Sequence, residues 1–478
     1  MTFDFLQTLL ADARSILLVA LFFGGSIFVH ELGHFLAARW RGAKVERFSI
    51  GFDPAIVSWR GRDGVKYQIG WIPLGGYVLL PQLADLGPIE GRSELDVERL
   101  PPVSYATKMI VFAAGALFNV LFAFGLASII WVIGQPEPND TATTRIGYVV
   151  RSFEPAGEPQ IPSPASEAGL RIGDVIQAID GHKVSKWADI YAFIGLGTGH
   201  SPDGRRETIF TILRDGRTLE VTLHPRLVGE DQERRVGVAP SYEMSVVEVA
   251  GGSVAAKAGF HPEDTIISLD GQLILNAQTY QDILEASTMR TVTARVRRNG
   301  QELTLTIPAR PQAKSGANIG LGLTVGFTYI YPTPFAQISE QVTMSYRTLW
   351  GLINPHSDIG LKKLSGPVTI VRIFHSAAEA GIRPVLMFTI LLNMSLAIFN
   401  LLPIPVLDGG QMMFATIGRL RGRALPVNFI MAANSVFIVL LFSMVIYVSY
   451  FNIRSWARDI KADRAAATPV TTPVPAKP

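Results

Sequence analysis

The sequence predicts a multi-pass α-helical membrane protein with four transmembrane helices, a membrane-associated β-ribbon and two similar α+β domains. Three observations predict this class. Four apolar segments each reach the about 20 residues that a helix needs to cross a bilayer. The long region between the second and third segments is polar and contains an internal repeat. A short stretch of alternating apolar and polar residues follows the first segment.

The composition excludes several other classes. The chain has 478 residues, of which 48% are hydrophobic, and its 43 Lys and Arg against 40 Asp and Glu leave a net charge of only +3. No basic block interleaved with aromatic residues occurs, so we expect no nucleic-acid partner. The absence of cysteine excludes disulfides, thiolate metal ligands and a cysteine nucleophile. The hydrophobic excess predicts the lipid bilayer as a partner.

The transmembrane helices are expected over about 16–38, 109–133, 385–406 and 429–451. The first segment has no basic start and no small-residue cleavage site, so we expect a retained helix rather than a signal peptide. The loops after the first helix and between the third and fourth are rich in arginine. Basic residues in short loops favour the cytoplasmic side. The N-terminus and the polar middle region are then expected outside, although bases at 362–363 and in the C-terminal tail favour the opposite orientation.

The stretch VKYQIGWIPLGGYVLL, residues 65–80, predicts the ribbon. Its first half alternates between apolar and polar side chains, PLGG is typical of a turn, and YVLL is read as a second strand. We expect a cytoplasmic-side β-ribbon that is apolar enough to touch the membrane. A small exposed hairpin is the alternative interpretation.

The middle region, about 135–310, contains two copies of one pattern. ASEAGLRIGDVIQAIDG (165–181) aligns without gaps on AAKAGFHPEDTIISLDG (255–271), an offset of 90 residues. Such a period is that of a small domain rather than of a solenoid repeat. Each copy predicts a short helix, a glycine turn, a strand and an Asp-Gly turn. The copies resemble PDZ domains of bacterial proteases, which bind an extended peptide along a sheet edge. Peptide tails are therefore expected partners, unless the two domains serve only for packing.

A helical pattern returns over about 334–353, and the proline-rich C-terminus is expected to be disordered. The predicted organisation begins with the first helix (1–40), the loop with the ribbon (41–104) and the second helix (105–134). The two PDZ domains (135–230 and 231–312) and a linker with an amphipathic helix (313–382) follow. The chain then continues with the third helix (383–408), a cytoplasmic loop (409–427), the fourth helix (428–452) and the tail (453–478).

The first apolar segment contains FVHELGHFLAAR, residues 28–39. On a helix, His30 and His34 lie on one face because they are four residues apart. With Glu31 they form the H-E-x-x-H pattern, in which two histidines bind zinc and the glutamate is the general base. Ionisable residues at bilayer depth are functional by default. The alternative is that the three residues pair with one another inside the bundle.

A catalytic zinc site needs a third protein ligand and one position for water. The best candidate is Asp408 in NLLPIPVLDGG (400–410), at the cytoplasmic end of the third segment. Broken backbone at membrane depth is tolerated where it lines a cavity. Alternatively, Asp408 caps a helix that starts near Gln411. Asn400 can donate to a substrate carbonyl or oxyanion, or bond across helices. In the second helix we expect a structural role for Gly115 and Asn119, which share a face.

Together these motifs resemble the site-2 protease family of intramembrane zinc metalloproteases, in particular its bacterial RseP-like branch. The resemblance covers nearly the whole chain and rests on motifs in one order: HELGH, RFSIGF (47–52), PLGGYV (73–78), G-x-x-x-N (115–119), two PDZ domains, LSGP (364–367) and N-x-x-P-x-P-x-L-D-G-G (400–410). Three positions depart from the family pattern. They are Asp53 in place of a frequent glycine, Ala116 in place of proline, and Gln411 in place of histidine.

The resemblance implies that Zn2+ is held by His30, His34 and Asp408 and that Glu31 activates water. It also implies that Asn400 positions the substrate, and that the strand with Gly75, Gly76 and Tyr77 pairs with an unwound substrate segment. The family cleaves transmembrane segments of single-pass proteins in regulated intramembrane proteolysis, including anti-sigma factors of stress responses and signal-peptide remnants. A bacterial inner-membrane location with periplasmic PDZ domains follows. The alternative function is a non-catalytic PDZ scaffold or membrane chaperone.

Overall fold

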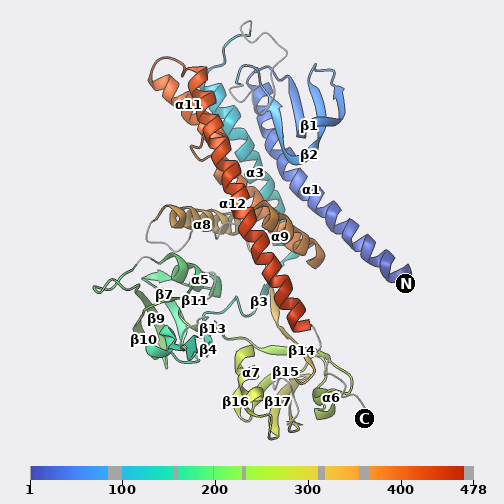
Figure 1. The fold of residues 1–478 in the computed structure, drawn as a ribbon, viewed down its shortest axis with the longest axis vertical. Coiled ribbons are helices and arrows are strands. Elements are labelled where there is room, and N and C mark those ends of the chain that lie inside the picture. Colours follow the sequence, from blue (N-terminus) through green and yellow to red (C-terminus); the bar gives the residue numbers. More distant parts are fainter. Residues whose placement is uncertain are drawn as a thin grey trace, which may run out of the picture. The chain divides into compact units, whose positions relative to one another are not determined.

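The computed structural model of the 478-residue chain describes residues 2–83, 100–153, 160–197, 199–228, 233–310, 318–354 and 366–467. The chain forms two compact units (Figure 1). The first unit contains residues 1–134, 331–347 and 360–478. The second contains residues 135–330 and 348–359. Of the LSGP motif, residues 364 and 365 lie outside the described residues.

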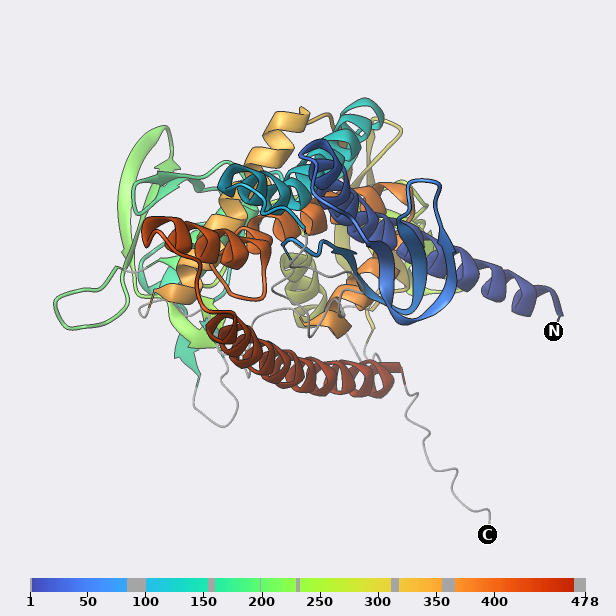
Figure 2. The same cartoon turned by 90° about the horizontal axis from the view of Figure 1, so that it is seen from above.

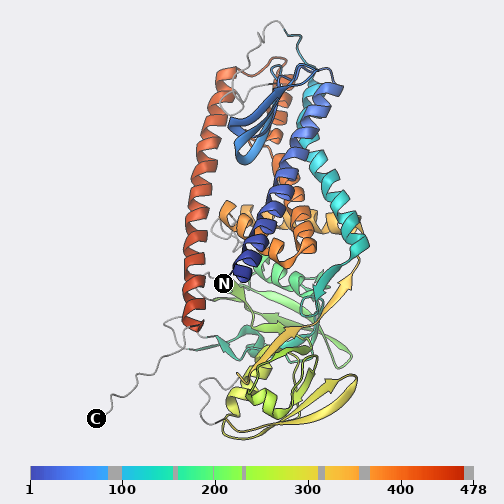
Figure 3. The same cartoon turned by 90° about the vertical axis from the view of Figure 1, so that its right-hand side faces the viewer.

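Each of the four predicted transmembrane segments forms a helix long and apolar enough to cross a membrane, but the third helix ends at Asn400 rather than near 406. These helices are α1 (Thr2–Trp40), α3 (Tyr105–Ile133), α10 (Ile382–Asn400) and α12 (Val427–Ala467). α1 and α3 lie side by side (Figure 3). Their approach is close because Gly33 has no side chain, and a Cβ there would lie 2.5 Å from the carbonyl oxygen of Ala114. α10 packs on α3 and on α1.

Among the described residues, three further helices belong to this part of the chain: α8 (Pro334–Ile353), α9 (Pro367–Ala380) and α11 (Asp408–Leu420). α8 is the helix predicted at 334–353, and it continues into the second unit. α9 was not predicted, because its 14 residues lie between Gly366 and Gly381 and are too short to span a bilayer. It packs on α1 and α10.

The prediction of a disordered tail over 453–478 is wrong for its first part. α12 continues as a helix to Ala467, whereas residues 468–478 lie outside the described residues. The reason is local propensity: SWARDIKADRAAA (455–467) consists mostly of good helix formers and contains no Pro or Gly. The proline-rich composition that predicted disorder begins only after this stretch.

The ribbon consists of β1 (Arg47–Arg60) and β2 (Lys66–Leu79), which lie beside α1 (Figure 2). Its pairing differs from the predicted hairpin. The segment Arg47–Ile50 pairs with Lys66–Ile69 on one side and with Gly76–Leu79 on the other. The two halves of β2 are therefore separated by β1 rather than joined to each other by a tight PLGG turn. RFSI thus occupies the centre of the sheet, and among the described strands Gly76–Leu79 is an edge.

The second unit contains two modules of the same topology. The first comprises β4 (Ile146–Val149), α4 (Pro164–Glu167), β7 (Val175–Ile179), β8 (His182–Lys183), α5 (Trp187–Leu196), β9 (Thr208–Arg214), β10 (Arg217–Leu223) and β13 (Val238–Pro240). The second comprises β14 (Met244–Val249), α6 (Val254–Ala258), β15 (Thr265–Leu269), β16 (Gln272–Leu273), α7 (Ala277–Ala286), β17 (Val292–Arg298), β18 (Gln301–Ile307) and β19 (Leu321–Val325). The offset of 90 residues is kept from β7/β15 through α5/α7.

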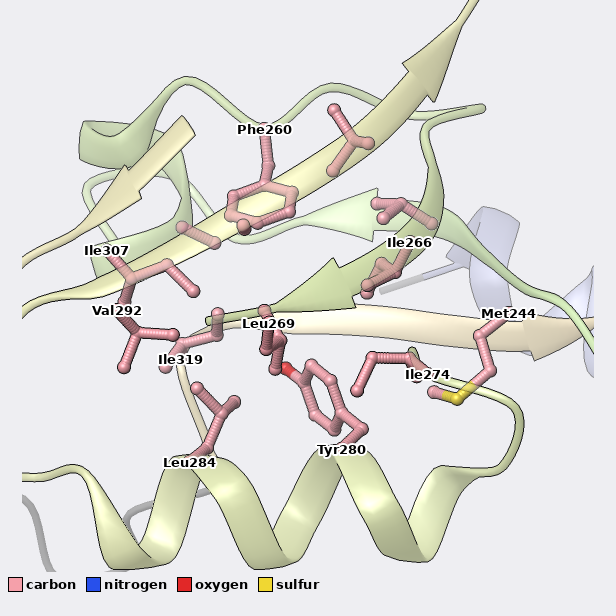
Figure 4. Packing of buried hydrophobic residues seen from close by; sticks show 14 residues of the cluster. Met244, Phe260, Ile266, Leu269, Ile274, Tyr280, Leu284, Val292, Ile307 and Ile319 are labelled. Carbon is pink, nitrogen blue, oxygen red and sulfur yellow. The ribbon is translucent and has the colours of Figure 1, made fainter. Parts of the chain in front are cut away.

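Each module has its own buried core, and the second is shown in Figure 4. The predicted domain ends at 230 and 312 cut off one strand from each core. Val236 is buried in the first core and Ile319 in the second, and β13 and β19 complete the respective modules. The repeat did not reveal these returning strands, because they lie outside the 17 residues that align.

The described part of the first module contains four more short strands, namely β5 (Ser152–Phe153), β6 (Ile161–Pro162), β11 (Arg226–Val228) and β12 (Glu233–Arg235). β3 (Gln135–Pro138) and β20 (Phe327–Ile330) pair antiparallel, with Gln135 opposite Ile330. The chain therefore enters and leaves the second unit at neighbouring positions.

Candidate metal centre and its cavity

His30 and His34 on α1 and Asp408 at the start of α11 come together in the first unit. The two Nε2 atoms are 3.1 Å apart. The Oδ2 atom of Asp408 lies 3.4 Å from the Nε2 atom of each histidine. The three residues that were predicted to bind one ion thus present their donor atoms to one point, although about 370 residues of sequence separate Asp408 from the histidines.

The triangle of donor atoms has the dimensions of a zinc site. A tetrahedral ion with bonds of about 2.0–2.1 Å requires ligand atoms about 3.3–3.4 Å apart. Oδ2 of Asp408 is buried and has no hydrogen-bond donor among the described residues. A carboxylate oxygen left in this state is unfavourable unless a cation compensates it. Two imidazoles and one carboxylate are also a donor set that zinc accepts.

The ring of His34 is held in the tautomer that metal binding needs. Its Nδ1 atom lies 2.8 Å from the carbonyl oxygen of Val111. A carbonyl can only accept, so the proton is on Nδ1 and the lone pair of Nε2 faces Asp408. Gly115, one turn further along α3, leaves the space for both rings. A Cβ at this position would lie 2.3 Å from Nε2 of His34 and 2.7 Å from Cε1 of His30.

Asp408 is directed to the histidines by the turn that precedes it. α10 ends at Asn400, and α11 begins at Asp408 after the segment 401–407. The N-cap of α11 is Leu407, so the alternative in which Asp408 caps a helix starting near Gln411 is wrong. Gly410 lets the new helix fold back over the turn, since a Cβ there would lie 2.0 Å from the carbonyl oxygen of Ile404.

A cavity of about 230 Å³ opens beside these donor atoms. It is lined by His30, Glu31, His34, Phe52, Gly76, Tyr77, Val78, Leu80, Leu83, Val111, Phe112, Asn400, Val406, Leu407, Asp408 and Gln411. Glu31 is 9% exposed and therefore has little access to bulk water. Asn400 lies at the end of α10 with its Nδ2 atom 3.5 Å from Nε2 of His30.

The edge strand of the ribbon reaches the same cavity. A Cβ on Gly76 would lie 2.9 Å from Cγ of Glu31 and 2.8 Å from the carbonyl oxygen of Ser49. A Cβ on Gly75 would lie 2.6 Å from the ring of Phe52. Tyr77 continues the edge strand and lines the cavity. Gly76 therefore lets the strand backbone run directly beside the side chain of Glu31, and Gly75 lets it pass the ring of Phe52.

A polar network that sequence reasoning missed holds this edge strand. The hydroxyl of Tyr77 receives a hydrogen bond from Nη1 of Arg47 at 2.9 Å and donates one to Oδ2 of Asp53 at 3.2 Å. Gln68 Nε2 donates to Oδ1 of Asp53 at 3.1 Å. The ring of Tyr77 stacks on that of Phe52, with centroids 6.2 Å apart. The signal for this network was Asp53 itself, the departure from the family pattern noted above.

A cluster of possible metal ligands beside a cavity, among apolar helices, is the arrangement expected of an intramembrane metalloprotease. The sequence pattern of "Peptidase family M50" matches residues 18–444, and the chain belongs to this family. This confirms the predicted resemblance to site-2 proteases.

Curated relatives from several bacteria have similar sequences. The Regulator of sigma-E protease RseP of Escherichia coli is 28% identical over 466 residues, which cover 89% of this chain and 95% of that protein. Protease RseP of Yersinia pestis is 28% identical over 461 residues, covering 88% and 95%. A Vibrio cholerae protein described as "Putative zinc metalloprotease" is 28% identical over 429 residues, covering 83% and 89%. The chain is thus an intramembrane zinc metalloprotease of the inner membrane that acts in regulated proteolysis of membrane proteins.

Proposed function

We propose that His30, His34 and Asp408 hold the catalytic Zn2+ and that Glu31 is the general base. The observation that carries this assignment is the triangle of donor atoms, 3.1–3.4 Å on each side, inside apolar helices and beside one cavity. Within the described residues this is the one group of three or more His, Asp or Glu side chains close enough to share an ion.

Each residue at the proposed zinc site has a separate role in peptide hydrolysis. A zinc ion held by His30, His34 and Asp408 would acidify a water molecule and polarise the scissile carbonyl. The carboxylate of Glu31 takes the proton of the attacking water and then delivers it to the leaving amine. Asn400 donates its amide N–H to the substrate carbonyl oxygen as negative charge develops there. The apolar helices around the site exclude bulk water and thereby strengthen these electrostatic interactions.

The ribbon prepares the substrate for this chemistry. A peptide bond inside a transmembrane helix is shielded by the hydrogen bonds of that helix, so the substrate must unwind before it is attacked. The edge formed by Gly75, Gly76 and Tyr77 offers backbone groups to which an extended segment can add as a further strand. Because Gly76 adjoins Glu31, a strand bound to this edge passes the general base.

The substrates we propose are single-pass membrane proteins cleaved in or near their transmembrane segment. Anti-sigma factor-like stubs are supported by the names of the relatives, which regulate sigma-E, and signal-peptide remnants are a second class. The arginine-rich loops around 39–47 and 419–423 support a cytoplasmic-side ribbon and periplasmic modules. The two modules, as PDZ domains, admit or reject substrates by their exposed peptide tails.

The test is a comparison of the full-length protein with Glu31→Gln. Both are purified in detergent and mixed with a single-pass substrate that ends just outside its transmembrane segment. Zinc content and cleavage products are measured together. We expect equal zinc and no product for Glu31→Gln. Product formed at the rate of the unchanged protein would refute the role of Glu31, and a protein without zinc would refute the donor set.

A further inference from the structure

Asn119 on α3 makes a contact that an interhelical packing role does not explain. Its side chain is completely buried, and its amide Nδ2 lies 3.3 Å from Nδ1 of His30. Each of the two histidines therefore has a group of α3 at its Nδ1 atom. For His34 that group is the carbonyl of Val111, and for His30 it is the amide of Asn119.

The proton on His30 decides how this amide must be oriented. Nε2 of His30 faces Oδ2 of Asp408 and Nε2 of His34. Its lone pair therefore points to the position proposed for the zinc ion. A neutral imidazole with a free lone pair on Nε2 carries its proton on Nδ1. An N–H there needs an acceptor, and the acceptor within reach is the amide oxygen of Asn119.

The amide oxygen of Asn119 accepts no hydrogen bond from the described residues. This atom, Oδ1, is buried. Rotating the amide by half a turn exchanges its oxygen and nitrogen within nearly the same volume. This rotation places Oδ1 against Nδ1–H of His30 and gives the buried oxygen a donor.

We propose that Asn119 is a positioning residue of the zinc site, which accepts the Nδ1 proton of His30 and so fixes the ring with Nε2 towards the metal. The proposal rests on the zinc site proposed above. Outer partners of this kind orient the ligand and increase its basicity. Gly115 and Asn119, four residues apart, share one face of α3. The glycine makes room for the two rings, and the asparagine sets the tautomer of one of them.

The test measures zinc affinity rather than proteolysis. The full-length protein, Asn119→Leu and Asn119→Asp are purified in detergent, and zinc is titrated in competition with a chromogenic chelator. Asn119→Leu keeps a similar volume but has no acceptor, so we expect affinity to fall about 10- to 100-fold. Asn119→Asp keeps an acceptor oxygen and is expected to bind zinc at least as tightly as the unchanged protein.

Asn393 on α10 provides a matched control. It is also completely buried and also has an amide oxygen without a partner among the described residues. Its amide nitrogen, however, donates to Ser26 and Thr389, at 2.8 Å each, and not to a histidine. Asn393→Leu is expected to retain the zinc affinity of the unchanged protein, whereas a purely packing role predicts similar losses in both variants.

A second measurement links the effect to His30. In the His30→Ala background, Asn119→Leu should weaken zinc binding no further, because the interaction it removes is already absent. Unchanged affinity in Asn119→Leu, or equal losses in Asn119→Leu and Asn119→Asp, would overturn the proposal while leaving the zinc site standing. Absence of zinc binding in the unchanged protein would instead refute the zinc site and the proposal together.

Discussion

Replacing Gly115 by alanine is expected to disrupt the proposed metal site while leaving helix α3 folded. A Cβ at this position would lie 2.3 Å from Nε2 of His34, whereas ordinary contacts begin at 3.4 Å. Either the ring or α3 must therefore move by about 1 Å. A displacement of this size at a reacting centre reduces the rate about 100-fold. Because the affected atom is itself a donor atom, zinc affinity should fall with the rate.

The helix itself should gain from the same substitution. Alanine is more favourable than glycine in a helix interior by about 1 kcal/mol. Gly115→Ala is thus expected to lose zinc and activity while keeping its helical content and its elution volume in detergent.

Gly125 on the same helix is the control, since a Cβ there meets nothing within 4 Å. Gly125→Ala should keep both zinc and activity. Zinc is measured by metal analysis after dialysis, and cleavage is measured on a single-pass substrate. If Gly115→Ala retains zinc and cleaves at the unchanged rate, the placement of the histidine rings against α3 is refuted.

Three further predictions concern the ribbon and the second module. Gly76→Ala places a Cβ 2.9 Å from Cγ of Glu31 and should slow cleavage about tenfold or more with zinc content unchanged. Asp53→Ala removes the acceptor of the Tyr77 hydroxyl and should raise KM more than it lowers kcat, since the edge strand is loosened but the metal donors are not touched. Asp264→Asn should destabilise the second module by about 3 kcal/mol, because it leaves a partly buried arginine without its carboxylate, and opening of the module is measured by labelling of an introduced buried cysteine.

The two ribbon predictions each have a control substitution in the chain. Gly24→Ala controls for Gly76→Ala, because a Cβ at Gly24 meets nothing within 4 Å. Asp63 lies in a similar cluster at the other end of the ribbon, where it accepts from Tyr67 at 2.8 Å and pairs with Arg39, away from the cavity lining. Equal effects of Asp63→Ala and Asp53→Ala on KM would contradict a specific role for Asp53.

The ion pair of the second module also predicts a dependence on pH. Burial by itself raises the pKa of Asp264, but hydrogen bonds from Arg298 and from the backbone N–H of His261 outweigh it, so the pKa lies below its usual value. The unfolded value is about 3.9. The stabilisation is therefore complete above about pH 4 and is lost as pH falls through the lowered folded pKa. The labelling rate is divided by that of the same cysteine in the unfolded protein at each pH, because only the thiolate reacts. A ratio that is independent of pH in this range would contradict the assignment. The chain has no native cysteine to interfere.

The parts of the site that the sequence predicted are those defined by local spacing or by a missing ligand. His30 and His34 follow from helical periodicity, and Asp408 follows from the need for a third ligand in a chain without cysteine. Periodicity cannot specify which strands pair, and the ribbon shows this. Arg47–Ile50 has two partner segments, and both strands of the ribbon also contact α1. The role of Asn119 could not be inferred either, because it depends on which ring atom of His30 it meets.

The pairing of β3 with β20 has a consequence for how this architecture can change. Gln135 and Ile330 are direct partners, so their Cα atoms lie about 4.5–5.5 Å apart. The whole segment between them is therefore an insertion whose two ends nearly touch, and a bridge of a few residues can replace it without stretching the flanking chain. The modules can be exchanged, duplicated or deleted while the helices that carry His30, His34 and Asp408 keep their connectivity. Under the role proposed for the modules, selection can thus alter substrate choice and leave the proposed zinc site as it is.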